Sequence, residues 1–286
     1  MKKSQIKRAF AKASAPVMRG RERTVVLCYH SVHPDRKCSD ARPDTFRAHL
    51  EYFDRECRVV DPHSFLCGEL TSASDDSRPR VVLTFDDGYA DNATFVRRML
   101  SEFGFKAAFF VTTGLVDRQS DVVARMRRLM RLAESDVDFM MGWQDVAALA
   151  NDGHLIGSHG VTHRNLANLD AGEQERELVE SRSTAELRLT LPVLDFAFPF
   201  GKPRVHQDEP LQSLSRQAGY RSAFSVEFSR VRQDSPFDIP RFTMNRDSIG
   251  DLELKIDGGF DVVGSWQRHA PRWLLRRISP WDFTFE

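Results

Sequence analysis

The sequence predicts an α/β fold in which about seven parallel strands alternate with helices and form a closed or nearly closed barrel. Short runs rich in Val, Leu, Ile and Phe recur along the chain, and stretches with apolar residues at helical spacing separate them. Continuous apolar runs are typical of strands buried on both faces, and their alternation with helices is typical of a parallel sheet. A chain of 286 residues has the length of a single barrel of this kind.

Each predicted element follows from its own pattern. The runs TVVLCY at 24–29 and RVVLTF at 80–85 are apolar almost throughout, whereas the segment 44–56 places Phe46, Leu50 and Phe53 at helical spacing. The further predicted strands are 106–112, 154–157, 195–200, 222–226 and 239–244, and the further predicted helices are a segment through Val96 and Leu100, 119–138, 143–151, 171–189 and 208–218.

The composition divides the chain into three parts. Residues 1–23 form a basic arm with eight Lys or Arg and one Glu, residues 24–260 form the barrel, and residues 261–286 form a tail in which arginines and aromatic residues mix. The whole chain has 41 basic and 41 acidic residues, so it lacks the basic excess of a nucleic-acid-binding protein. The basic arm is expected to be solvated, with contact of both termini with an anionic membrane surface as the alternative.

The expected location follows from what the chain lacks. The N-terminal segment has no apolar core of a secretory signal, and no run approaches the roughly 20 apolar residues of a membrane-spanning helix. The four cysteines contain no C-x2-C pair and are interpreted as reduced thiols. We therefore expect a cytoplasmic protein or one peripheral to the cytoplasmic membrane.

Three strand ends carry residues that a core does not require, and the first is Asp86-Asp87-Gly88 after the strand at 80–85. Neighbouring residues of an extended chain point to opposite sides, so a turn at Gly88 must begin here if both carboxylates are to reach one site. The alternative, that one Asp caps the following helix, leaves the other carboxylate unexplained.

The second is the pair His159 and His163, which follows the strand at 154–157. Their spacing places both imidazoles on one face of a helical turn, as a divalent metal requires. A surface pair is the alternative. However, parallel strands end at one rim of a barrel, so we expect these histidines near Asp86 and Asp87.

The third is Phe198-Pro199-Phe200-Gly201, at the end of the strand at 195–200. Pro and Gly favour a rigid turn that could present a backbone N–H to an oxyanion, and plain turn chemistry is the alternative. Two histidines and one carboxylate leave coordination positions open, and a second carboxylate can accept a proton from water. The three segments together predict metal-assisted hydrolysis of an amide or an ester.

These motifs resemble those of the polysaccharide deacetylase family, also called the NodB-homology domain or carbohydrate esterase family 4. TFDDG at 84–88, SHGVTH at 158–163 and FPFG at 198–201 occur in the order of the family's motifs. VVLCYHSV at 25–32 and IPRF at 239–242 are similar to the exopolysaccharide-linked branch. The resemblance covers roughly residues 24–245.

The resemblance implies a distorted (β/α) barrel of the NodB type that removes N-acetyl groups from amino sugars of a polysaccharide or of its biosynthetic precursor. It implies that Asp86 is the catalytic base and that the backbone N–H of Phe200 helps to stabilise the oxyanion. The implied metal is zinc, with nickel or cobalt as alternatives. The implied metal ligands are Asp87, His159 and His163, and the residues that shape the turn at Phe200 are Pro199 and Gly201.

Two positions depart from the family pattern. Ala197 stands where the third motif has an Arg that pairs with the base, and Arg241 is expected to replace that Arg. The LxLH motif that supplies a general acid is missing after Met244. His30, at the end of the first strand, is therefore the candidate acid, with a satisfied strand-end histidine as the alternative.

Three functional hypotheses follow, all of which involve a carbohydrate ligand. The first is an exopolysaccharide N-deacetylase, and the second is a deacylase or deformylase of a lipid-linked amino sugar at the cytoplasmic face of the membrane. The third is a catalytically silent sugar-binding barrel. The intact pairs Asp86–Asp87 and His159–His163 argue against the third.

Overall fold

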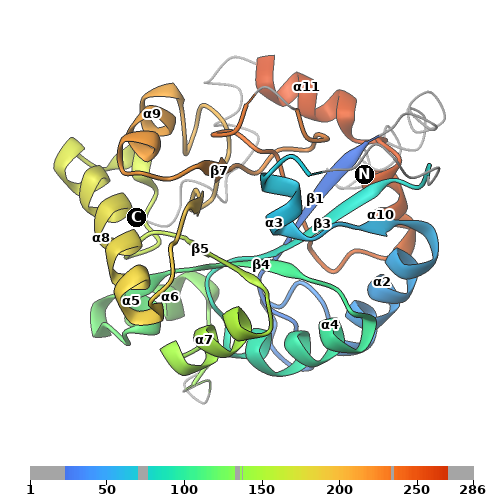
Figure 1. Ribbon diagram of the computed structural model, residues 1–286, viewed down its shortest axis with the longest axis horizontal. Coiled ribbons are helices and arrows are strands. Elements are labelled where there is room, and N and C mark those ends of the chain that lie inside the picture. The colour runs from blue at the N-terminus through green and yellow to red at the C-terminus, as the bar shows by residue number, and fades with distance from the viewer. Residues whose placement is uncertain (1–22, 70–76, 133–135, 137, 233–234, 270–286) are drawn as a thin grey trace.

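A sheet of eight strands forms the centre of the molecule (Figure 1). The computed structural model describes residues 23–69, 77–132, 136, 138–232 and 235–269. The strands are β1 (Thr24–Tyr29), β2 (Arg58–Val59), β3 (Arg80–Phe85), β4 (Ala107–Val111), β5 (Leu155–Ser158), β6 (Asp195–Ala197), β7 (Ser222–Phe224) and β8 (Phe242–Thr243).

Seven of these strands follow the order β7-β6-β5-β4-β3-β1-β8, and β2 pairs with the start of β3. The pairings between them are parallel. The segment that leads into β8 also meets β7, because Phe224 and Ile239 form a parallel bridge and the Ser225 N–H donates to the Ile239 carbonyl at 2.8 Å. The strands therefore curve round into a distorted barrel, which confirms the predicted fold class.

Alternate residues of the central strands enter two separate apolar clusters. In β1, Val25 and Leu27 pack in the cluster beneath the surrounding helices, whereas Val26 packs in the interior of the barrel. Side chains of a strand point alternately to its two faces, so both faces of these strands are buried. The same alternation places Val82, Ala108 and Phe110 of the next two strands in the interior cluster.

Helices cover the outer face of the sheet (Figure 1). One π-helical turn, η1 (Asn92–Val96), precedes α4, and one 3-10 turn, η2 (Leu166–Asn168), precedes α8. The α-helices are α2 (Pro43–Glu56), α3 (Pro62–Leu66), α4 (Arg97–Phe103), α5 (Thr113–Val116), α6 (Ser120–Met130), α7 (Trp143–Asn151), α8 (Ala171–Leu189), α9 (Glu209–Gln217), α10 (Ile249–Ile256) and α11 (Asp261–His269).

Most of the predicted elements are present, and the differences concern their ends. β1, β3, α7 and α8 have the predicted bounds, whereas β6, β7 and β8 are shorter than predicted. The helix predicted at 119–138 ends at Met130, because Arg131 adopts a left-handed conformation with φ 49°. The sequence analysis did not predict β2, α3, α5, α10 and α11. For α10 the signal was present, since Ser248 and Asp251 form a capping box.

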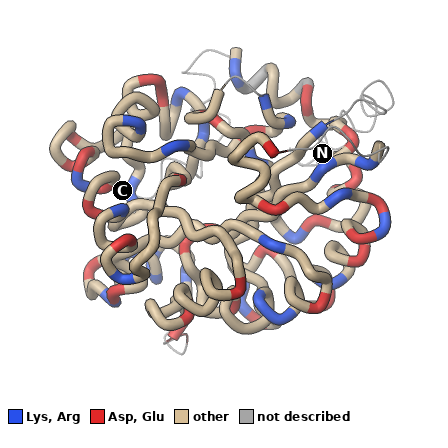
Figure 2. Tube along the Cα trace, in the orientation of Figure 1, with Lys and Arg blue, Asp and Glu red and all other residues tan. Residues whose placement is uncertain are grey.

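Residues 1–22 of the predicted arm and most of the predicted tail lie outside the described residues, as do residues 70–76. The start of the tail forms α11, and Arg23 Nη2 pairs with Asp261 Oδ1 at 2.9 Å. None of the helices in the described ranges combines the length and apolar character needed to cross a bilayer. Figure 2 shows acidic and basic residues interspersed over the outer helices, in agreement with their equal numbers.

Candidate active site

The first motif forms a tight turn at the carboxyl end of β3. The Gly88 N–H donates to the Asp86 carbonyl at 2.9 Å, and Asp87 between them has φ 72°. A left-handed conformation at a residue with a side chain costs free energy of order 1–3 kcal/mol and is often found at functional sites. The turn predicted for Asp86-Asp87-Gly88 is therefore present, and it brings both carboxylates to one side of the barrel rim.

Asp87 meets both histidines of the second motif. Its Oδ1 atom lies 3.1 Å from His163 Nε2 and 3.4 Å from His159 Nε2. All three side chains are buried, and their ligating atoms lie within 4.8 Å of one another. Neither carboxylate oxygen of Asp87 has a hydrogen-bond partner among the described residues.

This geometry fits a divalent cation. A buried carboxylate without hydrogen bonds is costly, and the neighbouring charges lower the pKa of Asp87 against the effect of burial, so it is ionised. A cation between two imidazole nitrogens and this carboxylate would satisfy all three groups. The Asp87, His159 and His163 side chains are therefore suited to hold a metal with open coordination positions.

The histidines do not lie on a helical turn, so that part of the prediction was wrong. Gly160 and His163 have φ 81° and 55°, and the segment is an irregular loop. The Val161 and Thr162 N–H groups donate to Glu177 Oε2 of α8 at 2.7 and 3.0 Å instead of to carbonyls of a preceding turn. A tertiary contact, and not helical periodicity, brings the two rings together.

His159 is oriented by the backbone. Its Nδ1 lies 2.7 Å from the Ala197 carbonyl, which fixes Nδ1 as the donor and leaves the Nε2 lone pair facing the carboxylates. Burial lowers the pKa of His159 to about 4, so the ring is neutral. A neutral imidazole with its second nitrogen bonded to a carbonyl is the usual state of a metal-binding histidine.

Asp86 is held by a different set of groups. Arg241 Nη1 and Nη2 each lie 2.7 Å from one of its carboxylate oxygens, and the Cys28 thiol lies 3.3 Å from Oδ2. Arg241 is fully buried, with its guanidinium 5.4 Å from the Phe110 ring centre and 5.6 Å from that of Phe224. Burial would raise the pKa of Asp86, but Arg241 and the nearby histidines lower it overall, so the carboxylate stays charged.

His30 follows β1 and reaches the same site. One of its ring nitrogens lies within 4.8 Å of the Cys28 sulfur and of an Asp86 oxygen. Its Nδ1 lies 2.9 Å from Asp40 Oδ2, and 30% of its side chain is exposed, whereas the other site histidines are buried. Burial opposes protonation, but Asp40 raises the pKa of His30 to about 10.

The third motif forms a second tight turn with the same hydrogen-bond pattern. The Gly201 N–H donates to the Pro199 carbonyl at 2.8 Å, and Phe200 between them has φ 63°. The Phe200 ring packs against His163 with ring centres 5.0 Å apart. A β-carbon at Gly201 would lie 2.9 Å from the Val226 nitrogen, so only glycine fits here without displacing the backbone.

Three residues of the site were not singled out in the sequence. Cys28 had a signal, since it lies two residues before His30 and therefore on the same face of the chain. Asp40 lies in a loop and Glu177 in a helix with many charges, so neither had a local signal.

Comparisons with known proteins define the class. The family model described as Polysaccharide deacetylase matches residues 73–223, which is more than half of the chain. The chain belongs to the polysaccharide deacetylase family.

Individual relatives are distant. The YxkH protein of Bacillus subtilis (strain 168) is 22% identical over 210 residues, which are 73% of this chain and 66% of that protein. This chain thus spans slightly less than two thirds of the length of that relative. An uncharacterized 30.6 kDa protein of Geobacillus stearothermophilus is 24% identical over 151 residues, which are 52% of this chain and 47% of that one.

Two solved structures share the fold. The deacetylase PplD of Streptococcus pyogenes, solved with acetate, has a TM-score of 0.65 and 18% identity, and the match covers 82% of this chain and 98% of that one. IcaB from Ammonifex degensii has a TM-score of 0.65 and 21% identity, and the match covers 83% of this chain and 98% of that one.

Proposed function

We propose that the protein is a metal-dependent hydrolase that removes N-acetyl groups from amino sugars of a polysaccharide or of its biosynthetic precursor. One observation carries the proposal. A candidate metal site of Asp87, His159 and His163 lies beside a second carboxylate, Asp86, which is held separately by an arginine. Family membership supports the substrate class.

Asp87, His159 and His163 hold the cation in this proposal. When bound, the cation supplies Lewis-acid activation of water and of the acyl carbonyl. Two nitrogens and one oxygen suit zinc, and also nickel or cobalt, because the ligand set alone does not separate these metals.

Asp86 accepts the proton from the attacking water. The two parallel hydrogen bonds from Arg241 keep Asp86 ionised and fix the direction of both carboxylate oxygens, so a lone pair is available without rotation of the side chain. Arg241 therefore acts as a positioning residue, in the role that the family's third-motif arginine has elsewhere.

The turn at Phe200 supplies a donor for the oxyanion. Its backbone N–H is fixed by the closed turn from Pro199 to Gly201 and needs no reorganisation during the reaction. His30 donates a proton to the leaving amine. Its contact with Asp40 orients the ring, and its exposed edge is open to a substrate.

Acyl release by metal-stripped protein tests this function. We would add zinc, nickel or cobalt and offer N-acetylglucosamine oligomers and, separately, N-acetylated or N-formylated lipid-linked amino sugars. We expect acyl release that depends on the added metal, and the rates with the different substrates will show which of them the protein prefers. Asp86→Asn should keep the metal and lose at least about a hundredfold in rate, because an amide cannot accept the proton.

Two outcomes would contradict the proposal. Near-normal turnover by Asp86→Asn would remove Asp86 as the base. If the intact protein neither bound a metal nor released an acyl group, a silent sugar-binding barrel would describe it better.

A further inference from the structure

A large cavity lies at the opposite end of the barrel from the candidate active site. Its volume is about 780 Å³, and its wall includes Thr24 at the start of β1, Arg80 at the start of β3 and Ser222 at the start of β7. The candidate active site lies at the carboxyl ends of these strands, about 20 Å away along β1. The volume is typical of a site for a small molecule, for which about 300–1,000 Å³ is usual.

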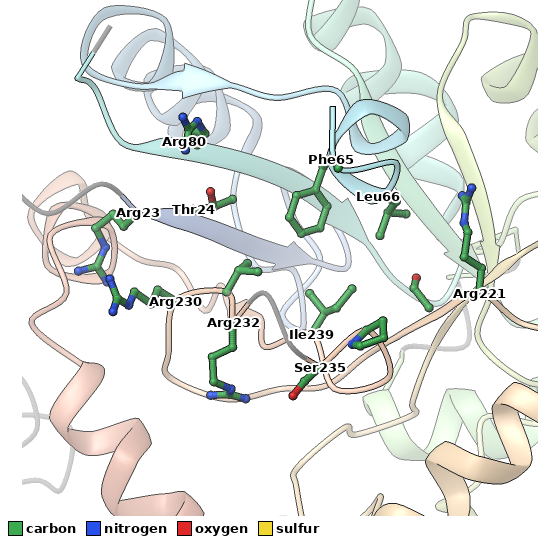
Figure 3. A pocket seen from close by; sticks show the side chains of 14 residues that line it. Arg23, Thr24, Phe65, Leu66, Arg80, Arg221, Arg230, Arg232, Ser235 and Ile239 are labelled. Carbon is green, nitrogen blue, oxygen red and sulfur yellow. The ribbon is translucent and has the colours of Figure 1, made fainter. Parts of the chain in front are cut away.

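The charged side chains in the wall of this cavity are all arginines. Figure 3 shows Arg23, Arg230 and Arg232 on one side and Arg221 on the other, with Phe65 between them. No Asp or Glu of the described part of the chain lines the cavity. We call it the arginine cavity; its five arginines are Arg23, Arg80, Arg221, Arg230 and Arg232.

Acidic partners fix several of these arginines from outside the arginine cavity. Arg23 Nη2 pairs with Asp261 Oδ1 at 2.9 Å, and Arg232 Nη1 pairs with Glu227 Oε1 at 3.1 Å. Asp261 and Glu227 line a neighbouring hollow of about 370 Å³, whose wall also includes Arg23, Arg230 and Arg232. The carboxylates thus hold the guanidinium groups in place and do not themselves enter the wall of the arginine cavity.

Donors remain for a ligand. Arg23 is 6% exposed, and its Nε atom is enclosed without a hydrogen-bond partner among the described residues. Its guanidinium packs tightly over Gly258, where an added β-carbon would lie 2.0 Å from Nη1. Arg230 is exposed and makes no ion pair within the described part of the chain. The Arg23 Nε atom and the Arg230 guanidinium therefore remain as donors, and a bound anion that accepts from them would stabilise this wall.

We propose that the arginine cavity binds a phosphate ester or pyrophosphate that carries an apolar group. A phosphate has three acceptor oxygens and close to two negative charges, so several guanidinium groups can bind it together. A carboxylate, by contrast, is satisfied by the two parallel N–H groups of a single arginine. Phe65, Val231 and Ile239 provide an apolar wall for the remainder of the ligand. Both an anionic lipid headgroup and a soluble phosphate compound have this chemistry.

Two binding measurements on the full chain test the proposal and separate these sources. The first is calorimetric titration with sodium pyrophosphate. The second is co-sedimentation with phosphatidylcholine vesicles, with and without phosphatidylglycerol. The test variants are Arg230→Glu and Arg232→Gln. The control is Arg176→Glu, which makes the same charge change as Arg230→Glu at an exposed residue of α8, away from the arginine cavity.

We expect pyrophosphate to bind, and to bind at least about tenfold more weakly to both test variants than to the control. If phosphatidylglycerol vesicles also retain the control but not Arg230→Glu, a lipid headgroup is the ligand. If the vesicles do not distinguish them, the ligand is a soluble phosphate. Acyl release should be unchanged in Arg230→Glu, since Arg230 lies far from the metal site.

The proposal is overturned if neither pyrophosphate nor phosphatidylglycerol vesicles bind the intact protein. Equal binding by Arg230→Glu, Arg232→Gln and the control would overturn it too, because the anion would then bind elsewhere. Circular dichroism of each variant shows whether it is folded. Arg230 is exposed and forms no ion pair with the described residues, so its variant tests the site without breaking one of the ion pairs of the described structure.

Discussion

Ala197 and Arg241 lie side by side in the interior of the barrel next to Asp86. Ala197 packs in the interior cluster with Phe110 and Phe224, and the Arg241 guanidinium lies over the same two rings. A small residue at 197 leaves room for the arginine that enters from 241. The arginine that pairs with Asp86 therefore comes from position 241, and not from position 197, where the family resemblance places it.

Arg241→Ala should lower the free energy of unfolding by about 3–5 kcal/mol, because it leaves the buried Asp86 carboxylate unpaired. It should also lower the rate of acyl release. The double variant Arg241→Ala/Ala197→Arg should recover part of both losses, since the new arginine starts from the same cluster. Urea unfolding and turnover measure this, with Arg98→Ala on the surface as the control. An Arg241→Ala protein with unchanged stability and an unchanged pH–rate profile would refute the assignment.

At the scale of elements, α8 holds the loop that carries both histidines. Glu177 is 5% exposed and accepts the Val161 and Thr162 N–H groups and the Thr162 hydroxyl. Without it, three loop donors would lose their partner and the loop would be free to move. The helix therefore supports the candidate metal site through this carboxylate, and Ser181 of the same helix accepts the Ser158 hydroxyl at 2.8 Å.

Glu177→Ala should weaken zinc binding by about 10–100-fold while all three ligands remain. The loss of buried hydrogen bonds should also cost about 1–3 kcal/mol of stability. Competition with a metal indicator measures the affinity. Glu180→Ala, an exposed carboxylate three residues along the same helix, is the matched control. Equal zinc affinity in the two variants would show that the loop does not depend on Glu177.

The junction of α7 and β5 contains a pH-sensitive contact away from the metal site. His154 is 4% exposed, and its Nδ1 accepts the Ala107 N–H at 3.2 Å. Burial, with help from Lys106, lowers the pKa of His154 to about 4. In the unfolded chain the pKa of His154 is near 6.5. Between pH 6.5 and pH 4 the unfolded chain therefore binds more protons than the folded protein, so stability falls as the pH falls from about 6.5 to 4.

His154→Asn keeps an acceptor for the Ala107 N–H and removes the titrating group. We expect the intact protein to lose about 3 kcal/mol more than this variant between pH 7 and pH 4. Urea unfolding at a series of pH values measures the difference. His159 titrates in the same range, so the comparison between the two proteins isolates His154. Parallel pH profiles would contradict the assigned pKa.

At the scale of the whole molecule, the candidate metal site joins residues that follow two different strands of the barrel. Asp87 belongs to the end of β3, and the two histidines follow β5, so a cation bound by all three links these strands. A ligand that binds only the folded state stabilises the whole protein in proportion to its concentration over its Kd.

Zinc at one hundred times its Kd should therefore add about 2.7 kcal/mol to the free energy of unfolding, and a chelator should remove it. Thermal unfolding with and without zinc measures the shift in Tm. Asp87→Asn should abolish the shift, whereas Asp86→Asn should keep most of it. A zinc-induced shift that survives Asp87→Asn would place the metal elsewhere.

Most of the strands, and the rim of the barrel at which the candidate site lies, could be predicted from the sequence alone. A strand that is buried on both faces has to be apolar throughout, and the runs at 24–29 and 80–85 show this pattern within six residues each. Asp86, Asp87, His159 and His163 could be singled out because they stand where such runs stop.

The contacts between the side chains of the candidate site depend on the tertiary structure. Arg241 and Asp86 are 155 residues apart, and Glu177 holds the histidine loop in place of the helical turn that the spacing predicted. Cys28, Asp40 and the arginine cavity likewise depend on segments that become neighbours only when the barrel closes. Patterns of hydrophobicity act over a few residues, whereas ion pairs and cavities depend on contacts between distant segments, so local patterns do not define them. Arg241 was expected beside Asp86 only because of the family resemblance.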